Sequence, residues 1–164
     1  MAFWTSSELF NPKVNFRFKV LLKKENAEFE QIWFAKSVTQ PSLTINTTQA
    51  RFLRHRFNFP SSYEWNEVEL VMVDPGTPST TSMFMKKMYN SSFHYNELRS
   101  MSKGNFLKQF NLVKIISLGP DGKEGDVWTL YGVIPTSINF SSFDYSSEEL
   151  TEVRLKIKYD FAKF

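Results

Sequence analysis

Cysteine is absent from this 164-residue chain, and histidine occurs only twice. Without cysteine the protein forms no disulfide, no thiolate nucleophile and no cysteine-ligated metal site. Neither His55 nor His94 has a second ligand at metal-site spacing, so we predict no metal and no cofactor. No serine lies in a nucleophile-elbow pattern, and no glycine-rich loop fits phosphate binding. These absences argue against catalysis, and we predict that the protein is not an enzyme and has no catalytic residue.

Long hydrophobic runs are missing as well. No stretch approaches the ~20 apolar residues that a membrane-spanning helix needs. The N-terminus lacks the basic start and apolar run of a secretory signal. We therefore expect synthesis in a reducing cytoplasm and no membrane insertion. The 20 basic and 17 acidic residues are mixed along the chain, which favours a solvated surface over a dedicated nucleic-acid site.

Phenylalanine is what the chain has in excess, with 17 copies. Aromatic residues favour strands and pack well on pleated faces. Apolar and polar residues alternate in many segments, as they do in strands with one buried face. The alternation is clearest in residues 151–161, which we predict to be one closing strand. The other predicted strands cover residues 14–22, 28–36, 52–59, 65–73, 106–118 and 126–134.

One helix and two hairpins complete the expected architecture. Thr77 or Ser79 can cap a helix that runs ragged as far as Leu98 or Met101. The turn chemistry of residues 119–125 predicts a hairpin, and the first two strands predict another. We find no internal repeat and no domain boundary, so residues 1–164 should form one domain with an N-terminal arm at 1–12. The sequence predicts a mainly β fold, an antiparallel sandwich or half-barrel of about seven to eight strands with one flanking helix.

A basic and aromatic stretch lies in the middle of the chain. Arg51, Arg54 and Arg56 alternate with phenylalanines that include Phe52. Such a pattern fits contacts with phosphates and stacked bases. It also fits a strand whose charged face meets acidic groups or water, and this is the interpretation that we favour.

Three places in the sequence, in order, resemble the tail tube proteins of contractile-tailed bacteriophages and of related contractile injection systems. The first is Phe52-x-Arg54-x-Arg56, followed by Trp65 and the alternating run to Asp74. The second is residues 132–137, Gly-Val-Ile-Pro-Thr-Ser. The third is residues 143–149, Phe-Asp-Tyr-Ser-Ser-Glu-Glu, followed by a closing strand that ends in Tyr-x-aromatic. The resemblance covers residues 14–161 in the order of elements.

The resemblance implies a structural protein of the virion tail. Six copies would form a ring whose inner sheets join, and stacked rings would hold the tape-measure protein and later pass DNA. The sheath protein would lie outside, with baseplate and tail-terminator proteins at the ends. Residues 46–62 would form a hairpin that reaches the next ring, making Arg51, Phe52, Arg54 and Arg56 contact residues. Glu67 and Glu69 are the candidate lumen face, because a conducting lumen should not hold phosphate. The expected fold-signature residues are Trp65, Trp128, Pro135, Asp144, Tyr145 and Tyr159.

The sequence departs from the family in its N-terminal arm, with Trp4 and Phe10, and in Ile134, where the family favours Trp. These departures leave open a baseplate protein that starts the tube, or the hexameric tube of a secretion system. A small-ligand-binding β-barrel, with aromatics lining a pocket, is the alternative from a different class. The sequence alone identifies neither the lumen-facing side nor the sheath contacts.

Overall fold

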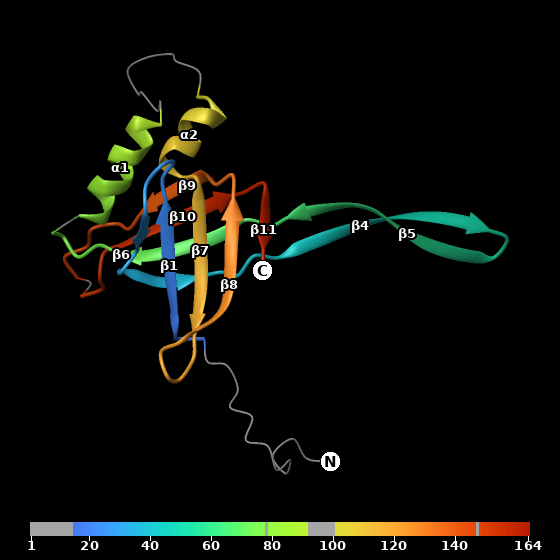
Figure 1. Ribbon diagram of the computed structural model, residues 1–164, viewed down its shortest axis with the longest axis horizontal. Helices are drawn as coiled ribbons and strands as arrows, with labels where there is room; N and C mark the ends of the chain where they lie inside the picture. Colours follow the sequence, from blue (N-terminus) through green and yellow to red (C-terminus); the bar gives the residue numbers. More distant parts are fainter. Residues whose placement is uncertain (1–14, 78, 92–100, 147) are drawn as a thin grey trace, which may run out of the picture.

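Two antiparallel sheets pack against each other in the computed structural model, which describes residues 15–77, 79–91, 101–146 and 148–164. A separate two-stranded hairpin projects from them, to the right in Figure 1. The predicted fold class, mainly β and antiparallel with flanking helix, is confirmed. The predicted arm at 1–12 and His94 lie outside the described residues.

The first sheet has five strands in the order β11-β8-β7-β1-β2. Their bounds are β1 Phe18–Lys23, β2 Phe29–Gln31, β7 Leu112–Leu118, β8 Glu124–Tyr131 and β11 Phe161–Lys163. The predicted hairpin over residues 119–125 is present, with Gly122 at a φ of 76°. The predicted first hairpin is also present, between β1 and β2.

The second sheet has four strands in the order β3-β6-β10-β9. Their bounds are β3 Ala35–Val38, β6 Val68–Val73, β9 Ile134–Phe140 and β10 Glu152–Lys158. The alternation predicted for β6 is observed, with Val68, Leu70 and Met72 all buried. Pro135 is tolerated because β9 is an edge strand, where one side of the backbone needs no ladder partner.

Two predicted strands are in fact broken, and each half joins a different sheet. Residues 28–36 divide into β2 and β3, and residues 151–161 divide into β10 and β11. The second break lies at Tyr159 and Asp160, where the chain crosses between the sheets. Phe161 is therefore not a buried member of β10; it is 43% exposed and stacks on Tyr131 at a centroid distance of 4.7 Å.

The predicted strand 126–134 was also too long. Gly132, at a φ of 67°, ends β8, and Ile134 begins β9. A β-carbon on Gly132 would lie only 2.0 Å from an Asp160 carboxylate oxygen. Both the left-handed backbone and this close approach therefore require glycine at the turn.

Helix α1, Thr80–Asn90, begins where predicted, because the Ser79 hydroxyl accepts a hydrogen bond from the Ser82 amide. It ends at Asn90, and most of its predicted continuation toward Leu98 or Met101 lies outside the described residues. Residues 103–109 form a second helix, α2 (Lys103–Gln109), where we predicted the start of a strand. The prediction was wrong because Ser102 caps a helical turn there, with its hydroxyl accepting from the Asn105 amide at 3.3 Å.

The core lies between the two sheets and is closed by the helices. Phe84 of α1 is fully buried and stacks on Phe110 at 6.4 Å. Lys87 of α1 is also buried, and its Nζ lies 2.9 Å from a Glu30 carboxylate oxygen on β2. Burial lowers the pKa of Lys87, and the ion pair partly offsets that effect. The helix is thereby joined to the edge of the five-stranded sheet.

Candidate subunit interface

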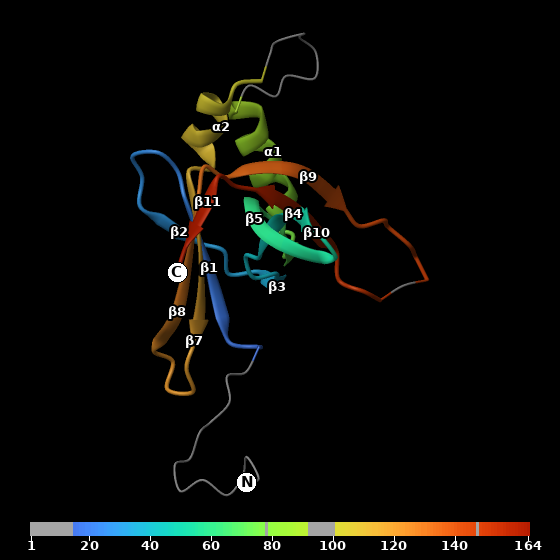
Figure 2. The ribbon, with the colours of Figure 1, turned by 90° about the vertical axis from the view of Figure 1, so that its right-hand side faces the viewer.

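The hairpin consists of β4, Leu43–Phe52, and β5, His55–Trp65. Every residue of β4 is exposed, and so is every residue of β5 except Trp65. The ribbon stands away from both sheets in Figure 1, and in Figure 2, where that side faces the viewer, it points toward the reader. A two-stranded hairpin with both faces in water is marginal on its own. This segment is therefore the part of the described chain that most needs a neighbour.

The residues predicted as contacts meet at the tip of this hairpin. Arg51 lies directly opposite Arg56, and Phe52 lies opposite His55. Arg54 is in the turn that joins the strands. The structure thus brings all four predicted residues together. Their role between rings stays a prediction.

Sequence reasoning missed the turn residue Leu53. Its φ is 54°, in the left-handed region that leucine rarely occupies, and its side chain is 85% exposed. The ribbon also carries an exposed apolar surface. Its large exposed hydrophobic residues are Leu43, Ile45, Phe52, Leu53, Phe57, Phe59 and Tyr63.

The hairpin is anchored at its base by aromatic packing. Trp65, at the end of β5, lies 5.8 Å from the Tyr159 ring, between centroids. Burial raises the pKa of Tyr159. The Trp65 indole N–H is buried with no hydrogen-bond partner among the described residues. We predicted that Trp65 opens the following strand; it instead ends β5 and fixes the hairpin to the body.

The other fold-signature residues divide into two groups. Trp128 packs edge-on against Phe164 at 4.9 Å, and Pro135 is buried in β9. Asp144 and Tyr145 are exposed in the loop between β9 and β10 and contribute nothing to the core. As fold-signature residues these two therefore mark a loop and not the core. The sequence contained a signal for their exposure, since neighbouring serines and acidic residues are typical of a loop.

Glu67 and Glu69 lie on the face of the four-stranded sheet that points away from the core. Glu69 is paired directly with Lys156, and a Glu67 carboxylate oxygen lies 3.7 Å from the Lys158 Nζ. Arg154 shares the same face of β10. The candidate lumen face therefore carries both signs of charge, and the two glutamates do not make it acidic. Its orientation toward a lumen stays a prediction.

Within the part of the chain that the structure describes, the four-stranded sheet has two edge strands with a partner on one side only. They are β3 and β9, the first and last strands in the sheet order. Unpaired edge strands present rows of backbone donors and acceptors that can pair with another chain. The described part of the chain holds no cluster of three or more His, Cys, Asp or Glu residues suited to a metal. It also contains no helix long and apolar enough to cross a membrane.

Comparison with solved structures identifies the fold. A chain of the anti-feeding prophage baseplate superposes with a TM-score of 0.74, 16% identity, and coverage of 94% of this chain and 96% of that one. The fold is that of contractile injection system proteins. A chain of the anti-feeding prophage tube-terminating cap gives a TM-score of 0.71, 18% identity, and coverage of 99% and 97%.

A third similar structure is the sheath–tube complex of an extracellular contractile injection system, PVC, in its extended state. Its matching chain gives a TM-score of 0.68 at 17% identity, with coverage of 94% of this chain and 92% of that one. The resemblance predicted from sequence is thus confirmed at the level of the fold. No protein-family model and no curated protein matches the sequence.

Proposed function

We propose that this chain is a structural subunit of a contractile-tail tube and acts by self-assembly. The observation that carries the proposal is the exposed β4–β5 ribbon, whose apolar side chains no other described part of the chain covers. The open edges β3 and β9 support it, because side-by-side copies would pair them into one continuous sheet. The shared fold with baseplate, cap and sheath–tube chains is consistent with this role.

In this proposal six copies form a ring and the rings stack, with the ribbon of one ring contacting the next. The four-stranded sheets line a lumen that holds a tape-measure protein and later passes DNA. A sheath protein surrounds the tube, and baseplate and terminator proteins close its ends. The protein would then be part of the tail of a virion or of a related injection machine, assembled in the cytoplasm. A tube initiator of the baseplate and a secretion-system tube are variants within the same class.

The ligand-binding barrel is not favoured by the architecture. The strands of the described residues form two separate sheets and a hairpin, not a closed barrel. The space between the sheets is filled by side chains that are at most 6% exposed, among them Val20, Leu70, Phe84, Leu130, Val133 and Leu155. A hollow of about 580 Å³ has Phe16, Phe18, Trp128 and Phe164 among its lining residues. It opens at the surface, because Phe16 and Phe164 are both more than 70% exposed, and it is not the interior of a barrel.

Negative-stain electron microscopy of the purified protein across a concentration series tests the proposal. We expect rings at low concentration and stacked rings or hollow tubes at high concentration. Uniform monomers at every concentration, with no rings even under molecular crowding, would refute self-assembly. Rings that never stack would instead favour a baseplate or cap position over a repeating tube subunit.

A further inference from the structure

Two surfaces of the molecule carry opposite charge beside exposed apolar side chains. The hairpin tip, defined as residues 50–57, contains three arginines, and residues 43–63 contain no Asp or Glu. The acidic loop, defined as residues 141–151 between β9 and β10, contains three carboxylates and no Lys or Arg. Phe57 is 50% exposed on the first surface, and Phe143 is 92% exposed on the second.

The hairpin tip places like charges side by side. Arg51 and Arg56 are a directly opposite cross-strand pair, so their side chains share one face of the ribbon. Like charges in such a pair destabilise a hairpin. The guanidinium groups of Arg51, Arg54 and Arg56 form no ion pair with any described residue. A carboxylate supplied by another molecule would remove the repulsion and form charge-assisted hydrogen bonds.

The turn at the tip is also locally unfavourable. Leu53 holds a left-handed backbone conformation in a position where glycine or asparagine would cost less. Its side chain is 85% exposed, so packing within the chain does not compensate for the strain. Strained, exposed apolar residues of this kind are found where a partner makes contact.

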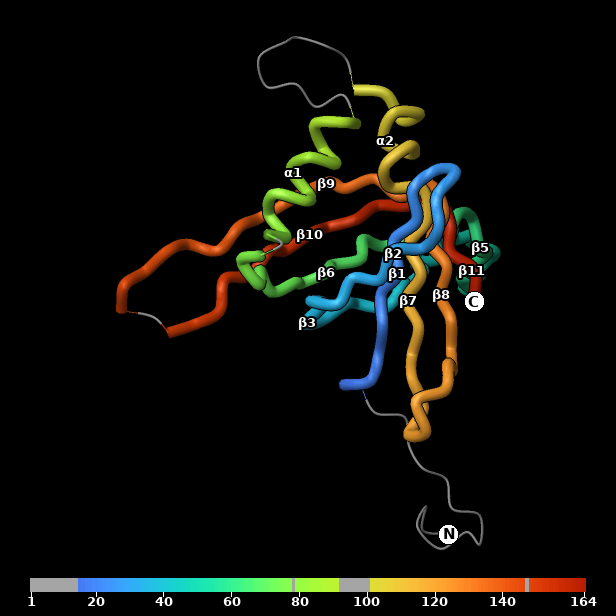
Figure 3. The backbone as a smooth tube through the Cα atoms, turned by 60° about the vertical axis from the view of Figure 1, so that its left-hand side comes forward, coloured from blue at the N-terminus to red at the C-terminus, as the bar shows by residue number. Residues whose placement is uncertain are grey.

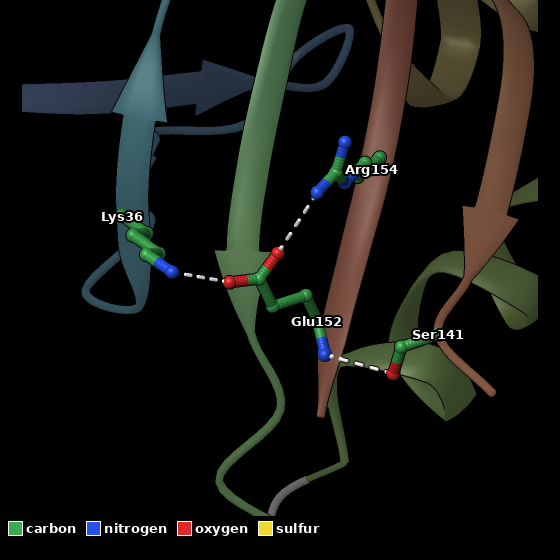
Figure 4. A network of polar contacts seen from close by, with 4 residues as sticks. All are labelled: Lys36, Ser141, Glu152 and Arg154. Carbon is green, nitrogen blue, oxygen red and sulfur yellow. Dashed lines mark hydrogen bonds and ion pairs between the residues drawn. The ribbon is translucent and has the colours of Figure 1, made fainter. Parts of the chain in front are cut away.

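The acidic loop is presented on a fixed base. The Glu152 amide donates to the Ser141 hydroxyl at 3.0 Å, and the Ser141 amide donates to the Glu152 carbonyl at 3.0 Å. The Glu152 carboxylate in turn binds Lys36 and Arg154, as Figure 4 shows. These contacts tie the loop base to β3 and to β10.

The outer part of the loop combines carboxylates with apolar side chains. Asp144 accepts hydrogen bonds from the Ser146 amide at 2.9 Å and from the Ser146 hydroxyl at 2.7 Å, and both lower the pKa of Asp144. Glu148 is exposed, and so are Phe143, Tyr145 and Leu150. This surface is complementary to the hairpin tip in both charge and hydrophobicity.

The hairpin tip and the acidic loop of one chain cannot meet. The hairpin base lies near Val68 and Ile157, at one end of the four-stranded sheet, and the acidic loop follows Phe140 at the other end. A strand of seven residues separates these ends by roughly 20 Å, and the ribbon extends roughly 30 Å further away. Figures 1 and 3 show the two segments leaving the body in different directions. The complementary surface must therefore come from a second molecule.

We propose that the hairpin tip of one subunit docks on the acidic loop of a second copy of this chain. Arg54 and Arg56 would bind the carboxylates of Asp144 and Glu148, and Leu53 would pack against Phe143 and Tyr145. Because the two surfaces differ, the contact is head-to-tail, the type that continues along a stack. The inference rests on the proposed self-assembly and names the surfaces through which it proceeds.

Charge reversal on each surface tests the docking. The hairpin variant carries Arg54→Glu and Arg56→Glu, and the loop variant carries Asp144→Lys and Glu148→Lys. Each alone should raise the concentration needed for stacking roughly tenfold or more, because like charges then face each other. The four substitutions together in one chain should restore stacking, and so should an equal mixture of the two variants. A control matched to the loop variant, Glu28→Lys with Asp121→Lys, makes the same change in net charge as that variant at exposed sites elsewhere and should stack like the wild type.

Sedimentation and electron microscopy at fixed salt give the readout, and circular dichroism verifies that each variant is folded. The docking is overturned if the loop variant stacks as the wild type does, or if the hairpin variant is impaired and the four-substitution chain is not rescued. The second result would indicate that the hairpin binds another surface or a different protein, such as the sheath. Failure of the wild type itself to assemble would instead contradict the proposed function, so the two failures are distinguishable.

Discussion

The two-sheet body and the β4–β5 hairpin of this protein differ in what stabilises them. In the body, Val20, Met72 and Phe84 are completely buried, and apolar residues of both sheets interdigitate. In the hairpin, Phe52, Phe57 and Phe59 are all at least 50% exposed, although the strands are longer than most strands of the body. The same residue type therefore stabilises the fold in one region and remains unburied in the other.

This difference separates folding from assembly. Burial of apolar area is the main favourable term in folding, and the body obtains it within one chain. The hairpin can obtain it only at an interface. Substitutions in the body should therefore change the free energy of unfolding, whereas substitutions in the hairpin should change association.

The largest expected effect is that of Phe84→Ala in the body. The substitution removes a fully buried ring that stacks on Phe110, and such truncations cost about 3–5 kcal/mol. Urea unfolding followed by tryptophan fluorescence measures the loss. The matched hairpin change, Phe57→Ala, should alter the free energy of unfolding by less than about 0.5 kcal/mol. Equal changes in the free energy of unfolding for the two substitutions would contradict the proposed difference between body and hairpin.

An intermediate effect is expected for Asp74→Asn, which tests how the body positions α1. Burial alone would raise the pKa of Asp74, but hydrogen bonds from Gly76, Thr80 and Thr81 outweigh it and lower the pKa from 3.8 to about 2. The ionised carboxylate therefore stabilises the fold, and its loss should cost about 1–2 kcal/mol at pH 7.

The pH dependence of that cost follows from the lowered pKa. The stabilisation by Asp74 is fully present above about pH 4 and disappears as the pH falls through 2. Thermal unfolding of wild type and Asp74→Asn should therefore differ by a constant amount at neutral pH and converge near pH 2. A difference that persists unchanged at pH 2 would show that the carboxylate charge is not what α1 requires.

Most of the body could be predicted from the sequence, because local signals agree with the final packing there. Two signals of this kind depend only on residues nearby in the sequence. One is the alternation of Val68, Leu70 and Met72 in β6, and the other is the capping serine Ser79 of α1. The hairpin at residues 119–125 was equally predictable from its turn residues. In all of these the pattern that predicts the element is also the pattern that stabilises it.

The predictions of secondary structure failed where the same sequence pattern fits two different arrangements of the chain. Alternation continues through Tyr159 to Phe161, yet the chain leaves one sheet and enters the other between them. Period-two alternation records which face a side chain takes but not which sheet it belongs to. Phe106 and Phe110 were similarly read as strand residues, although their spacing of four also fits the buried side of α2 and its C-cap.

The interface was predictable only in part. The three arginines were visible in the sequence, but their meeting at one tip depends on the register that pairs Arg51 with Arg56. The acidic loop was singled out only as part of the resemblance, and the sequence did not show that Phe143 and Tyr145 are exposed there. A hydrophobic side chain indicates that the residue will be buried. It does not indicate whether the same chain or a second molecule buries it.

The smallest effect on folding, and the sharpest separation of the two regions, is expected from Leu53→Gly at the hairpin tip. Glycine adopts the φ of 54° without strain, so the isolated subunit should be as stable as the wild type or more stable by up to about 1 kcal/mol. Stacking should nevertheless weaken several-fold, because the exposed side chain that would contact the acidic loop is gone. Thermal unfolding and sedimentation on the same sample measure the two effects. Improved stability together with undiminished stacking would mean that Leu53 serves neither folding nor docking, since its strain would then have no compensating contact in either the subunit or the tube.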